Sequence, residues 1–302
     1  MKHFQKTASV VRRTLTKISP MLNTRVLYFF KFHRRLNLNK PETLNEKILW
    51  LKYHNYRNNE LVRQCADKYR VREYVKSIGC GELLNELYGA WKTPEEIDWE
   101  KLPERFVLKL NTACGFNRIV LDKSSEDMAL LNMELHRWLK EAPKYWLGYA
   151  EMQYKDVEPL ILAEKYLSGT DGILPEDYKF YCFNGKAEYV MVCADRELGK
   201  KAAYFYFDRN WKMMPFSEDY FRNPDRVVPR PPLIDEAFRA AEQLSREFPF
   251  VRTDLYIVED RIVFGELTFT PSAGLDQGRR PETDRLLGEM LHVSEGSEKE
   301  EK

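Results

Sequence analysis

Two apolar segments flank the dipeptide Asn184-Gly185, and this pattern constrains the fold more than any other part of the chain. The segments Tyr178–Phe183 and Ala187–Cys193 are long enough for strands, and Asn-Gly between such runs is typical of a tight hairpin turn. Val251–Val258 and Ile262–Phe269 form a second candidate hairpin. Hairpins require antiparallel pairing, and the helices predicted elsewhere occur in mixed order with strands. The sequence therefore predicts an α+β fold with antiparallel sheets.

Composition excludes several classes of protein. The chain has 302 residues, 43% of them hydrophobic and 13% aromatic, which is enough for a substantial core and excludes a disordered or collagen-like chain. The longest apolar runs, such as 189–194 and 202–207, have six residues, far below the roughly 18–20 of a membrane-spanning helix. Five cysteines form no CxxC pair and no metal-ligand spacing, which indicates reduced thiols in a cytoplasmic compartment.

Charge is distributed unevenly along the chain, although the net charge is only +1. Residues 1–41 contain ten Lys or Arg and no Asp or Glu, so the other 261 residues carry nine net negative charges by subtraction from the total. Apolar residues at helical spacing alternate with these cations. Two interpretations stay open: a basic arm that lies on an anionic membrane surface or a polyanion, or a basic helix packed on an acidic protein body.

Capping motifs and apolar periodicity predict further elements. Thr43-Leu-Asn-Glu46 is a capping box that opens a helix, and Thr93 to Glu96, with Pro94 at the first helical position, indicates another helix start. Further helices are predicted over 61–77, where a break near Tyr69 can interrupt them, 126–140 and 235–247. Further strands are predicted over 106–110, 119–121, 160–166 and 202–207.

The last hairpin places four polar side chains on one face by alternation: Arg252, Asp254, Glu266 and Thr268. A turn near Asp260 brings Asp254 and Glu266 opposite each other or one step off, at a Cβ separation of about 5 Å where like charges repel. A positive group is therefore expected between the two carboxylates. Arg252 and a hard divalent cation such as Mg²⁺ are both candidates, and a solvated charged face on an edge hairpin is the third interpretation.

Three other segments carry polar residues at strand ends. Lys109 lies in the apolar strand 106–110 and precedes the small-residue loop 111–117, which suits a phosphate site. The strand 160–166 leads through Glu164 into a turn that precedes Asp171. Lys179 and Arg196 flank the Asn-Gly hairpin, where they could approach a triphosphate. Taken alone, each pattern is more typical of surface charge or of an ordinary strand end.

In this order, the four segments resemble the ATP-grasp superfamily, in which a nucleotide is held between two α+β lobes. The similarity is closer to the teichuronopeptide-biosynthesis (TupA-like) ATP-grasp family of polysaccharide gene clusters, and it covers about residues 36–290. The stretches that carry it are PETLNEKILWLK (41–52), DKYRVREYV (67–75), LPERFVLKLN (102–111), ILAEKYL (161–167), DYKFYCFNGK (177–186), FPFVRTDLY (248–256) and FGELTFTP (264–271).

The resemblance implies a role for each matched residue. Nucleotide contacts would come from Lys109 at the α- and β-phosphates, from Glu164, Lys165, Tyr166 and Leu167 at adenine, from Asp171 at the ribose, and from Lys179. The catalytic residues, facing the γ-phosphate and the acyl intermediate, would be Arg196 and Arg252, with Lys179 beside them. The Mg²⁺ ligands would be Asp254, Glu266 and Thr268.

Two departures from the family pattern stand out. Relatives usually carry a His-Gly-Ser-Gly-like loop where this chain has Thr112-Ala-Cys-Gly115, and a loop with fewer glycines folds less readily over phosphates. Thr268 stands where many relatives have Asn, so a hydroxyl replaces an amide oxygen as the expected metal ligand. The domains expected from the resemblance are a helical basic arm (1–35), an N-terminal helical or α+β lobe (36–104), the ATP-grasp small lobe (105–168), the large lobe with the metal hairpin (169–290) and a charged, disordered tail (291–302).

The activity implied by the resemblance is that of an ATP- and Mg²⁺-dependent carboxylate–amine ligase, which forms an amide through an acylphosphate. The expected partners are a glycan or small-molecule carboxylate, such as a uronic-acid group of a surface polysaccharide or its precursor, and an amine; no nucleic acid is expected. The expected location is the cytoplasm, at the inner membrane surface if the basic arm associates with it. A glycosyltransferase, for which the chain lacks an Asp-x-Asp motif, and a non-catalytic nucleotide-binding protein are the alternatives.

Overall fold

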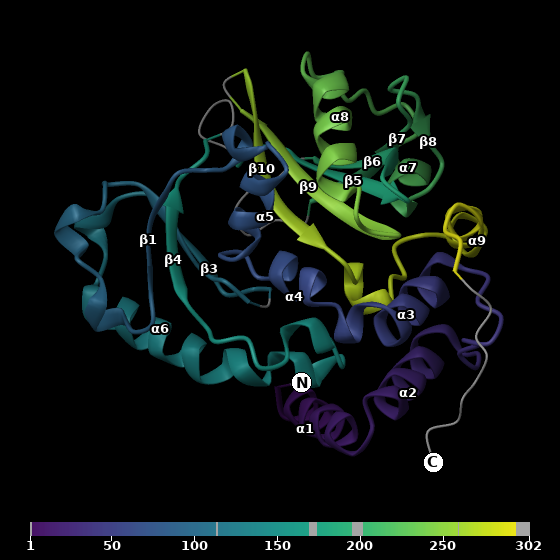
Figure 1. Ribbon diagram of the computed structural model, residues 1–302, viewed down its shortest axis with the longest axis horizontal. Coiled ribbons are helices and arrows are strands. Elements are labelled where there is room, and N and C mark those ends of the chain that lie inside the picture. Colours follow the sequence, from purple (N-terminus) through teal and green to yellow (C-terminus); the bar gives the residue numbers. More distant parts are fainter. Residues whose placement is uncertain (1, 113, 169–173, 195–201, 259, 294–302) are drawn as a thin grey trace. The chain divides into compact units, whose positions relative to one another are not determined.

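The computed structural model describes residues 2–112, 114–168, 174–194, 202–258 and 260–293 (Figure 1). The chain divides into two compact units, and each unit is assembled from two separate stretches of sequence. Unit 1 comprises Met1–Thr24 and Asn58–Leu167, and unit 2 comprises Arg25–Arg57 and Ser168–Lys302. Helix α2 (Pro20–Phe32) contains the boundary between them.

Unit 1 contains a four-stranded antiparallel sheet in the order β1-β4-β2-β3. Its strands are β1 (Leu87–Trp91), β2 (Phe106–Leu110), β3 (Asn117–Val120) and β4 (Ile161–Lys165). Its helices are α1 (Lys2–Ile18), α4 (Glu60–Ala66), α5 (Val71–Ser77), α6 (Met128–Glu141) and the 3-10 helices η3 (Pro94–Glu96) and η6 (Ala142–Gly148), with shorter turns between them.

The core of unit 1 lies between one face of this sheet and α6. Alternation along β2 buries Phe106, Leu108 and Leu110 in a cluster that includes Leu135 and Trp138 of α6. Because side chains alternate, Lys109 is on the opposite face of β2 from these core residues. The apolar pattern of the strand thus fixes the direction in which its single lysine points.

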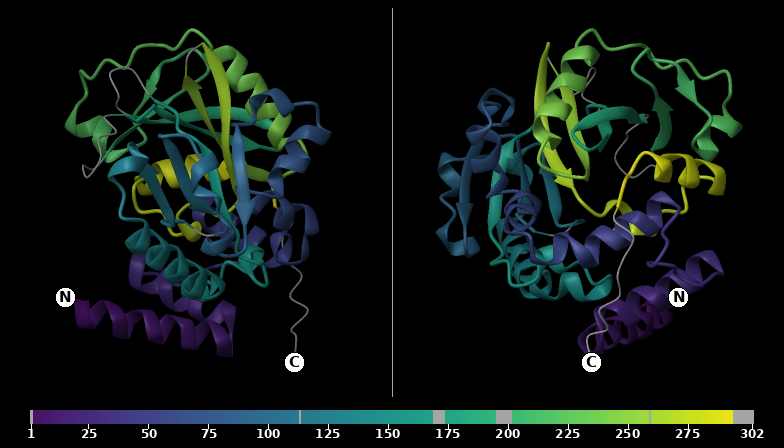
Figure 2. Two further views of the ribbon diagram at one scale, coloured as in Figure 1. Left: turned by 90° about the vertical axis from the view of Figure 1, so that its left-hand side faces the viewer. Right: turned by 45° about the vertical axis from the view of Figure 1, so that its right-hand side comes forward.

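Unit 2 contains a six-stranded antiparallel sheet in the order β10-β9-β5-β6-β7-β8. Its strands are β5 (Asp177–Phe183), β6 (Lys186–Ala194), β7 (Ala203–Phe207), β8 (Met213–Met214), β9 (Phe250–Val258) and β10 (Arg261–Thr268). Its helices are α3 (Leu44–His54), α7 (Glu218–Arg222), α8 (Ile234–Ser245) and α9 (Pro281–Glu289). Helix α8 packs against β9, β6 and β5, which lie beside it in Figures 1 and 2.

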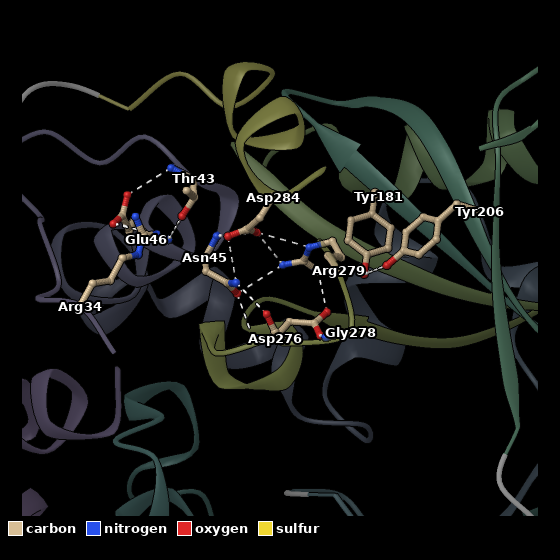
Figure 3. Close-up of polar contacts among 10 residues, drawn as sticks. All are labelled: Arg34, Thr43, Asn45, Glu46, Tyr181, Tyr206, Asp276, Gly278, Arg279 and Asp284. Atoms are coloured by element: carbon tan, nitrogen blue, oxygen red, sulfur yellow. Dashed lines mark hydrogen bonds and ion pairs between the residues drawn. The ribbon is translucent and has the colours of Figure 1, made fainter. Parts of the chain in front are cut away.

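Most of the predicted elements form, and the local signals that predicted them are visible in the structure. The turn between β5 and β6 holds Asn184 at φ 50° and Gly185 at φ 78°, the left-handed values that an Asn-Gly hairpin turn needs. Helix α3 begins with the predicted capping box, in which Thr43 and Glu46 exchange backbone and side-chain hydrogen bonds (Figure 3).

The helical stretch predicted over 61–77 forms as two helices, α4 and α5, with a break between them. The carboxylate of Asp67 causes the break, because its Oδ1 atom accepts hydrogen bonds from the backbone N–H groups of Tyr69 and Arg70. These two bonds hold the turn between Asp67, the C-cap of α4, and Arg70, the residue before α5.

The helix start predicted at Thr93, with Pro94 at the first position, forms only as the single 3-10 turn η3 and does not continue as an α-helix. Thr93 makes no side-chain capping hydrogen bond, and Ile97 returns to an extended conformation. Glu96 instead accepts a hydrogen bond at 2.8 Å from the backbone N–H of Lys92, which ties this turn to the preceding residues. The predicted tail (291–302) falls mostly outside the described residues. Within the described part of the chain, no helix is long and apolar enough to span a membrane.

Candidate functional site

Charged side chains from three neighbouring strands gather on one face of the unit 2 sheet. Glu266 of β10 pairs directly with Asp254 of β9, which in turn pairs with Lys179 of β5. Directly paired residues project to the same face, so the three side chains form one row across the strands. The opposition of Asp254 and Glu266 predicted from the sequence is confirmed, with a bulge beside Glu266 where the register shifts.

Lys179 is held between two aspartates. Its Nζ atom lies 2.6 Å from Oδ2 of Asp254 and 2.6 Å from Oδ2 of Asp177, which precedes it by two residues on the same face of β5. Burial alone lowers the pKa of this ammonium, but the two carboxylates outweigh burial and raise its pKa above the ordinary value. Lys179 is therefore a permanent positive charge in this site.

Arg252 binds the other side of Asp254. Its Nε and Nη2 atoms donate at 2.7 Å to Oδ1 and Oδ2 of that carboxylate, a bidentate pairing. Nη2 also donates to Thr268 Oγ1 at 3.2 Å and lies 3.7 Å from Glu266 Oε1. Burial lowers the pKa of Arg252, and Asp254 raises it by more, so the guanidinium stays charged. The positive group expected between the two carboxylates is thus present in the chain itself.

The same residues offer oxygen ligands that suit Mg²⁺. Glu266, whose side chain is 37% exposed, accepts a hydrogen bond from Thr268 Oγ1 at 3.0 Å, and Asp254, which is 3% exposed, is shared by Arg252 and Lys179. Carboxylate and hydroxyl oxygens are hard ligands of the kind Mg²⁺ takes, with water and phosphate completing its shell. Among the described residues, no three His, Cys, Asp or Glu side chains already surround a metal position.

The charge of the cluster favours a bound cation. Three carboxylates, Asp177, Asp254 and Glu266, face two cations, Lys179 and Arg252, so these five described side chains together carry one net negative charge. Glu266 is the most exposed of the three acids, so it is the carboxylate that a metal ion can reach with the smallest rearrangement. The donor set therefore fits Mg²⁺, with Glu266 and Thr268 as the most accessible ligands.

A buried polar network supports this sheet from the segment that follows β10. Arg279, whose side chain is 1% exposed, pairs with Asp276 at 2.6 Å and with Asp284 of α9 at 3.0 Å (Figure 3). Asn45, in the first turn of α3, donates to Asp284 Oδ2 at 3.0 Å. The network joins α3, α9 and the chain after β10 within unit 2, so it fixes the path of the chain that leaves the Glu266 strand.

In unit 1, Lys109 and Glu164 face each other across β2 and β4. The Nζ atom of Lys109 lies 2.7 Å from Glu164 Oε2, and both side chains are largely buried. Two residues on, Asn111 holds the start of the loop 111–117 by donating to Asp67 Oδ2 at 2.8 Å and accepting from the backbone N–H of Leu160 at 2.7 Å. The strand pairing thus brings together Lys109 and Glu164, which are 55 positions apart in the sequence and were both predicted to contact the nucleotide.

The other predicted site residues are less fully placed. Strand β4 ends at Lys165, so Tyr166 and Leu167 follow the strand and are only partly buried, rather than extending it as the sequence suggested. Asp171 and Arg196 lie outside the described residues.

Two polar residues were not assigned a role from the sequence. Asp177 contacts Lys179, and its alternation with that lysine in the sequence is the signal that could have revealed it. Asn111 could not be recognised, because its partners Asp67 and Leu160 are distant in sequence.

Comparison with known families explains why these clusters occur in this order. The family model described as TupA-like ATP-grasp matches residues 46–292. The chain belongs to this family. Its α+β fold is accordingly the ATP-grasp fold, which was the prediction from the sequence stretches. No curated protein has a sequence that matches the chain.

Solved structures similar to this TupA-like ATP-grasp protein are distant from it in sequence. D-alanine–D-alanine ligase from Bacillus anthracis, in complex with ATP, is 15% identical, with 76% of this chain and 63% of that chain covered and a TM-score of 0.44. L-amino acid ligase from Bacillus licheniformis is 13% identical, with 71% of this chain and 43% of that chain covered and a TM-score of 0.41. Phosphoribosylamine–glycine ligase from Thermotoga maritima is 12% identical, with 75% of this chain and 55% of that chain covered and a TM-score of 0.43.

The chain thus covers less than two thirds of the length of the D-alanine–D-alanine ligase. Membership of the family rests on the family match and not on these distant similarities in fold.

Proposed function

We propose that this protein is an ATP- and Mg²⁺-dependent ligase that joins a carboxylate to an amine through an acylphosphate. The observation that carries the proposal is the row of Lys179, Asp254 and Glu266 with Arg252 beside it, on one face of a sheet in a chain of the TupA-like ATP-grasp family. Phosphoryl transfer needs fixed positive charge and a metal-binding carboxylate around the transferred group, and this face supplies both.

In the proposed reaction, a substrate carboxylate oxygen attacks the γ-phosphorus of ATP. The bond from that phosphorus to the bridging oxygen breaks, and ADP leaves as the acylphosphate forms. An amine nitrogen then attacks the acyl carbon, the carbon–oxygen bond to phosphate breaks, and the amine gives up a proton as inorganic phosphate departs. Mg²⁺ bound by Glu266, Thr268 and Asp254 would neutralise charge on the phosphates.

The chain's own residues have separable roles in this proposal. Arg252, fixed by its two hydrogen bonds to Asp254, presents a charged guanidinium whose orientation needs no reorganisation during the reaction. Lys179 is held by two carboxylates and is proposed to contact the nucleotide phosphates. Lys109 of unit 1 is assigned to the α- and β-phosphates, and Glu164 to Leu167 to the adenine, on the resemblance to the family.

For the substrate, we propose a uronic-acid group of a surface polysaccharide or its precursor, with an amino acid or amino alcohol as the amine. This assignment rests on the resemblance of the sequence to the teichuronopeptide-biosynthesis (TupA-like) family of polysaccharide gene clusters. The corresponding product is an amide of the sugar acid.

The decisive experiment measures ADP release with Mg²⁺ and ATP, using D-glucuronate or D-galacturonate as the acid and alanine or ethanolamine as the amine. We expect ADP release that requires both substrates, and Glu266→Gln to lower it by at least about a hundredfold while the fold is retained. Glu188→Gln is the matched control, because Glu188 lies three strands away in β6 and is partly exposed.

Three outcomes would contradict the proposal. ADP release by Glu266→Gln near the unmutated rate would show that the site is wrong. Tight MgATP binding with no ADP release under any acid and amine combination would favour a non-catalytic nucleotide-binding protein. Release of UDP from a UDP-sugar would favour a glycosyltransferase.

A further inference from the structure

The two N-terminal helices bury several polar side chains and expose several large apolar ones. In α1 the inward side includes Thr16, which is 1% exposed, and in α2 it includes Asn23 and Thr24, at 0% and 1%. In contrast, large apolar side chains of both helices are exposed: Val10 63%, Val11 51%, Ile18 71%, Leu22 43%, Phe29 50% and Phe30 71%. Exposure of these apolar side chains to water is unfavourable, because burial of apolar surface is the main favourable term in folding.

Exposed apolar side chains of α1 lie two turns apart on one face of the helix. Val11 and Ile18 are seven residues apart, which is two turns, so they lie on the same face. The inward side is held by charged contacts: Arg13 pairs with Glu141 of unit 1 at 3.3 Å, and Arg12 donates to Tyr149 at 2.9 Å. Cations therefore attach this helix to the protein, and aliphatic residues are left facing outward.

In α2, Leu22, Arg25 and Phe29 have the spacing i, i+3 and i+7 and form one exposed stripe, with Phe30 next to it. Two neighbouring phenylalanines that are half-exposed or more are unusual on a short surface helix, since an exposed aromatic ring gains nothing in water. Large apolar side chains exposed together on one short helix are typical of an interaction site.

These helices hold a disproportionate share of the exposed apolar residues. Thirteen large hydrophobic side chains are exposed among the described residues, and six of them lie between positions 10 and 30. The same part of the chain is uniformly basic, with ten Lys or Arg and no Asp or Glu in residues 1–41. Exposed cations adjoin the apolar side chains on both helices, including Lys17 and Arg25.

We infer that the exposed faces of α1 and of α2 each bind the surface of a bilayer that contains anionic lipid. An interfacial site needs apolar side chains that enter the acyl region and cations that pair with lipid phosphates, and these helices have both. A second copy of the chain is disfavoured as the occupant, because a two-fold contact would bring like cations together. The inference does not depend on the proposed ligase activity.

The test is flotation of the full chain with vesicles, without nucleotide. We expect binding to vesicles of equimolar phosphatidylcholine and phosphatidylglycerol, little binding to pure phosphatidylcholine, and weakening as salt is raised. Phe29→Ser/Phe30→Ser should lower the affinity for the anionic vesicles by at least about tenfold, because the two rings supply apolar contact area. Lys17→Gln/Arg25→Gln should weaken binding and reduce its salt dependence.

The matched control is Leu130→Ser/Met133→Ser on α6, which removes two apolar side chains of similar exposure, 62% and 68%, outside the basic segment. It should bind vesicles as the unmutated chain does. All the substituted side chains are exposed, so circular dichroism and thermal unfolding should be unchanged.

Equal binding by Phe29→Ser/Phe30→Ser and the unmutated chain would overturn the inference, as would equal binding to neutral and anionic vesicles. A concentration-dependent dimer in sedimentation equilibrium that is lost in Phe29→Ser/Phe30→Ser, with no vesicle binding, would assign the surface to a second copy instead.

Discussion

At the scale of single residues, the site depends on three buried charges that compensate one another. Asp254 is contacted by Lys179 and by Arg252, and its side chain is only 3% exposed. Buried ion pairs add little to stability when complete, but removing one partner leaves an uncompensated charge with no access to water. Lys179 matters most in this group, because it contacts Asp177 as well as Asp254.

Lys179→Met is therefore expected to lower the free energy of unfolding by about 3–5 kcal/mol at neutral pH. Without the ammonium, Asp177 and Asp254 each lose a charged partner that lies 2.6 Å away. Removing one of these carboxylates in Lys179→Met/Asp177→Asn should therefore recover part of the deficit.

Urea unfolding of Lys179→Met and of Lys179→Met/Asp177→Asn at neutral pH measures the effect. Lys186→Met, which replaces an exposed lysine at the start of β6, is the control and should change stability by less than about 0.5 kcal/mol. A deficit of equal size in the single and the double variant would show that lost packing, and not uncompensated charge, is responsible.

The sequence predicted part of this site at residue level. Alternation along β9 and β10 placed Arg252, Asp254, Glu266 and Thr268 on one face, and the pairing of Asp254 with Glu266 is confirmed. The sequence left open whether Arg252 or a metal ion lies between them, since both satisfy the same repulsion. The sequence could not predict the contact of Lys179 with Asp254, because that contact follows from the pairing of β5 with β9 and joins residues 75 positions apart. The catalytic and metal-binding roles of these residues stay predictions.

At the scale of elements, local sequence patterns predicted turns and helix caps, but they did not reveal which distant strands pair. The Asn-Gly turn and the Thr43 capping box were predicted because each depends on residues within a few positions. The order β1-β4-β2-β3 places β4 between two strands that precede it in the chain, and no local pattern specifies that arrangement. At Thr93 the local signal was misleading, because a capping sequence does not ensure that enough chain follows to form a helix.

Packing between elements also explains a glycine in α9. An added Cβ at Gly288 would lie 2.3 Å from the carbonyl oxygen of Glu42 and 2.8 Å from the carbonyl carbon of Thr43, just before α3. Both contacts are with backbone, which cannot move away as a flexible side chain can. The glycine is therefore what permits α9 to approach the start of α3.

Gly288→Ala should lower the free energy of unfolding by about 2–4 kcal/mol, despite the better helix propensity of alanine. Gly148→Ala is the control, because an added Cβ at Gly148 meets nothing within 4 Å. Denaturant unfolding of both variants checks the prediction. Equal stability of the two variants would mean that α9 does not lie this close to α3.

At the scale of the whole molecule, each compact unit joins stretches that are far apart in the sequence. Residues 25–57 belong with 168–302, because α3 packs on α9 and on the segment after β10. The domains expected from the resemblance are contiguous segments, and their boundaries stay predictions. A contiguous division is the natural expectation from sequence, since composition and linkers reveal where a segment changes but not which segments pack together.

Both units contain tyrosines whose pKa is raised by burial, and these tyrosines should make the folded protein less stable at high pH. Burial raises the pKa of Tyr28, Tyr56, Tyr178 and Tyr206 in unit 2 and of Tyr145 in unit 1 above the ordinary value of a phenol. In the unfolded chain these tyrosines lose their protons near pH 10. Because the folded pKa is the higher one, the stabilisation is complete below about pH 10 and is lost as pH rises above it.

Stability should therefore be constant from about pH 8 to 9.5 and then fall by about 1.4 kcal/mol per pH unit for each buried tyrosine. The pKa of Lys179 is also raised in the folded protein, so this residue likewise lowers the stability of the folded state as pH rises. Urea midpoints measured across this range, together with tyrosinate absorbance, test the prediction: the buried phenols should ionise only as the protein unfolds, in one cooperative step. Gradual ionisation of all tyrosines near pH 10 in a protein that stays folded would mean that these hydroxyls are accessible to water, and the burial assigned to them would be wrong.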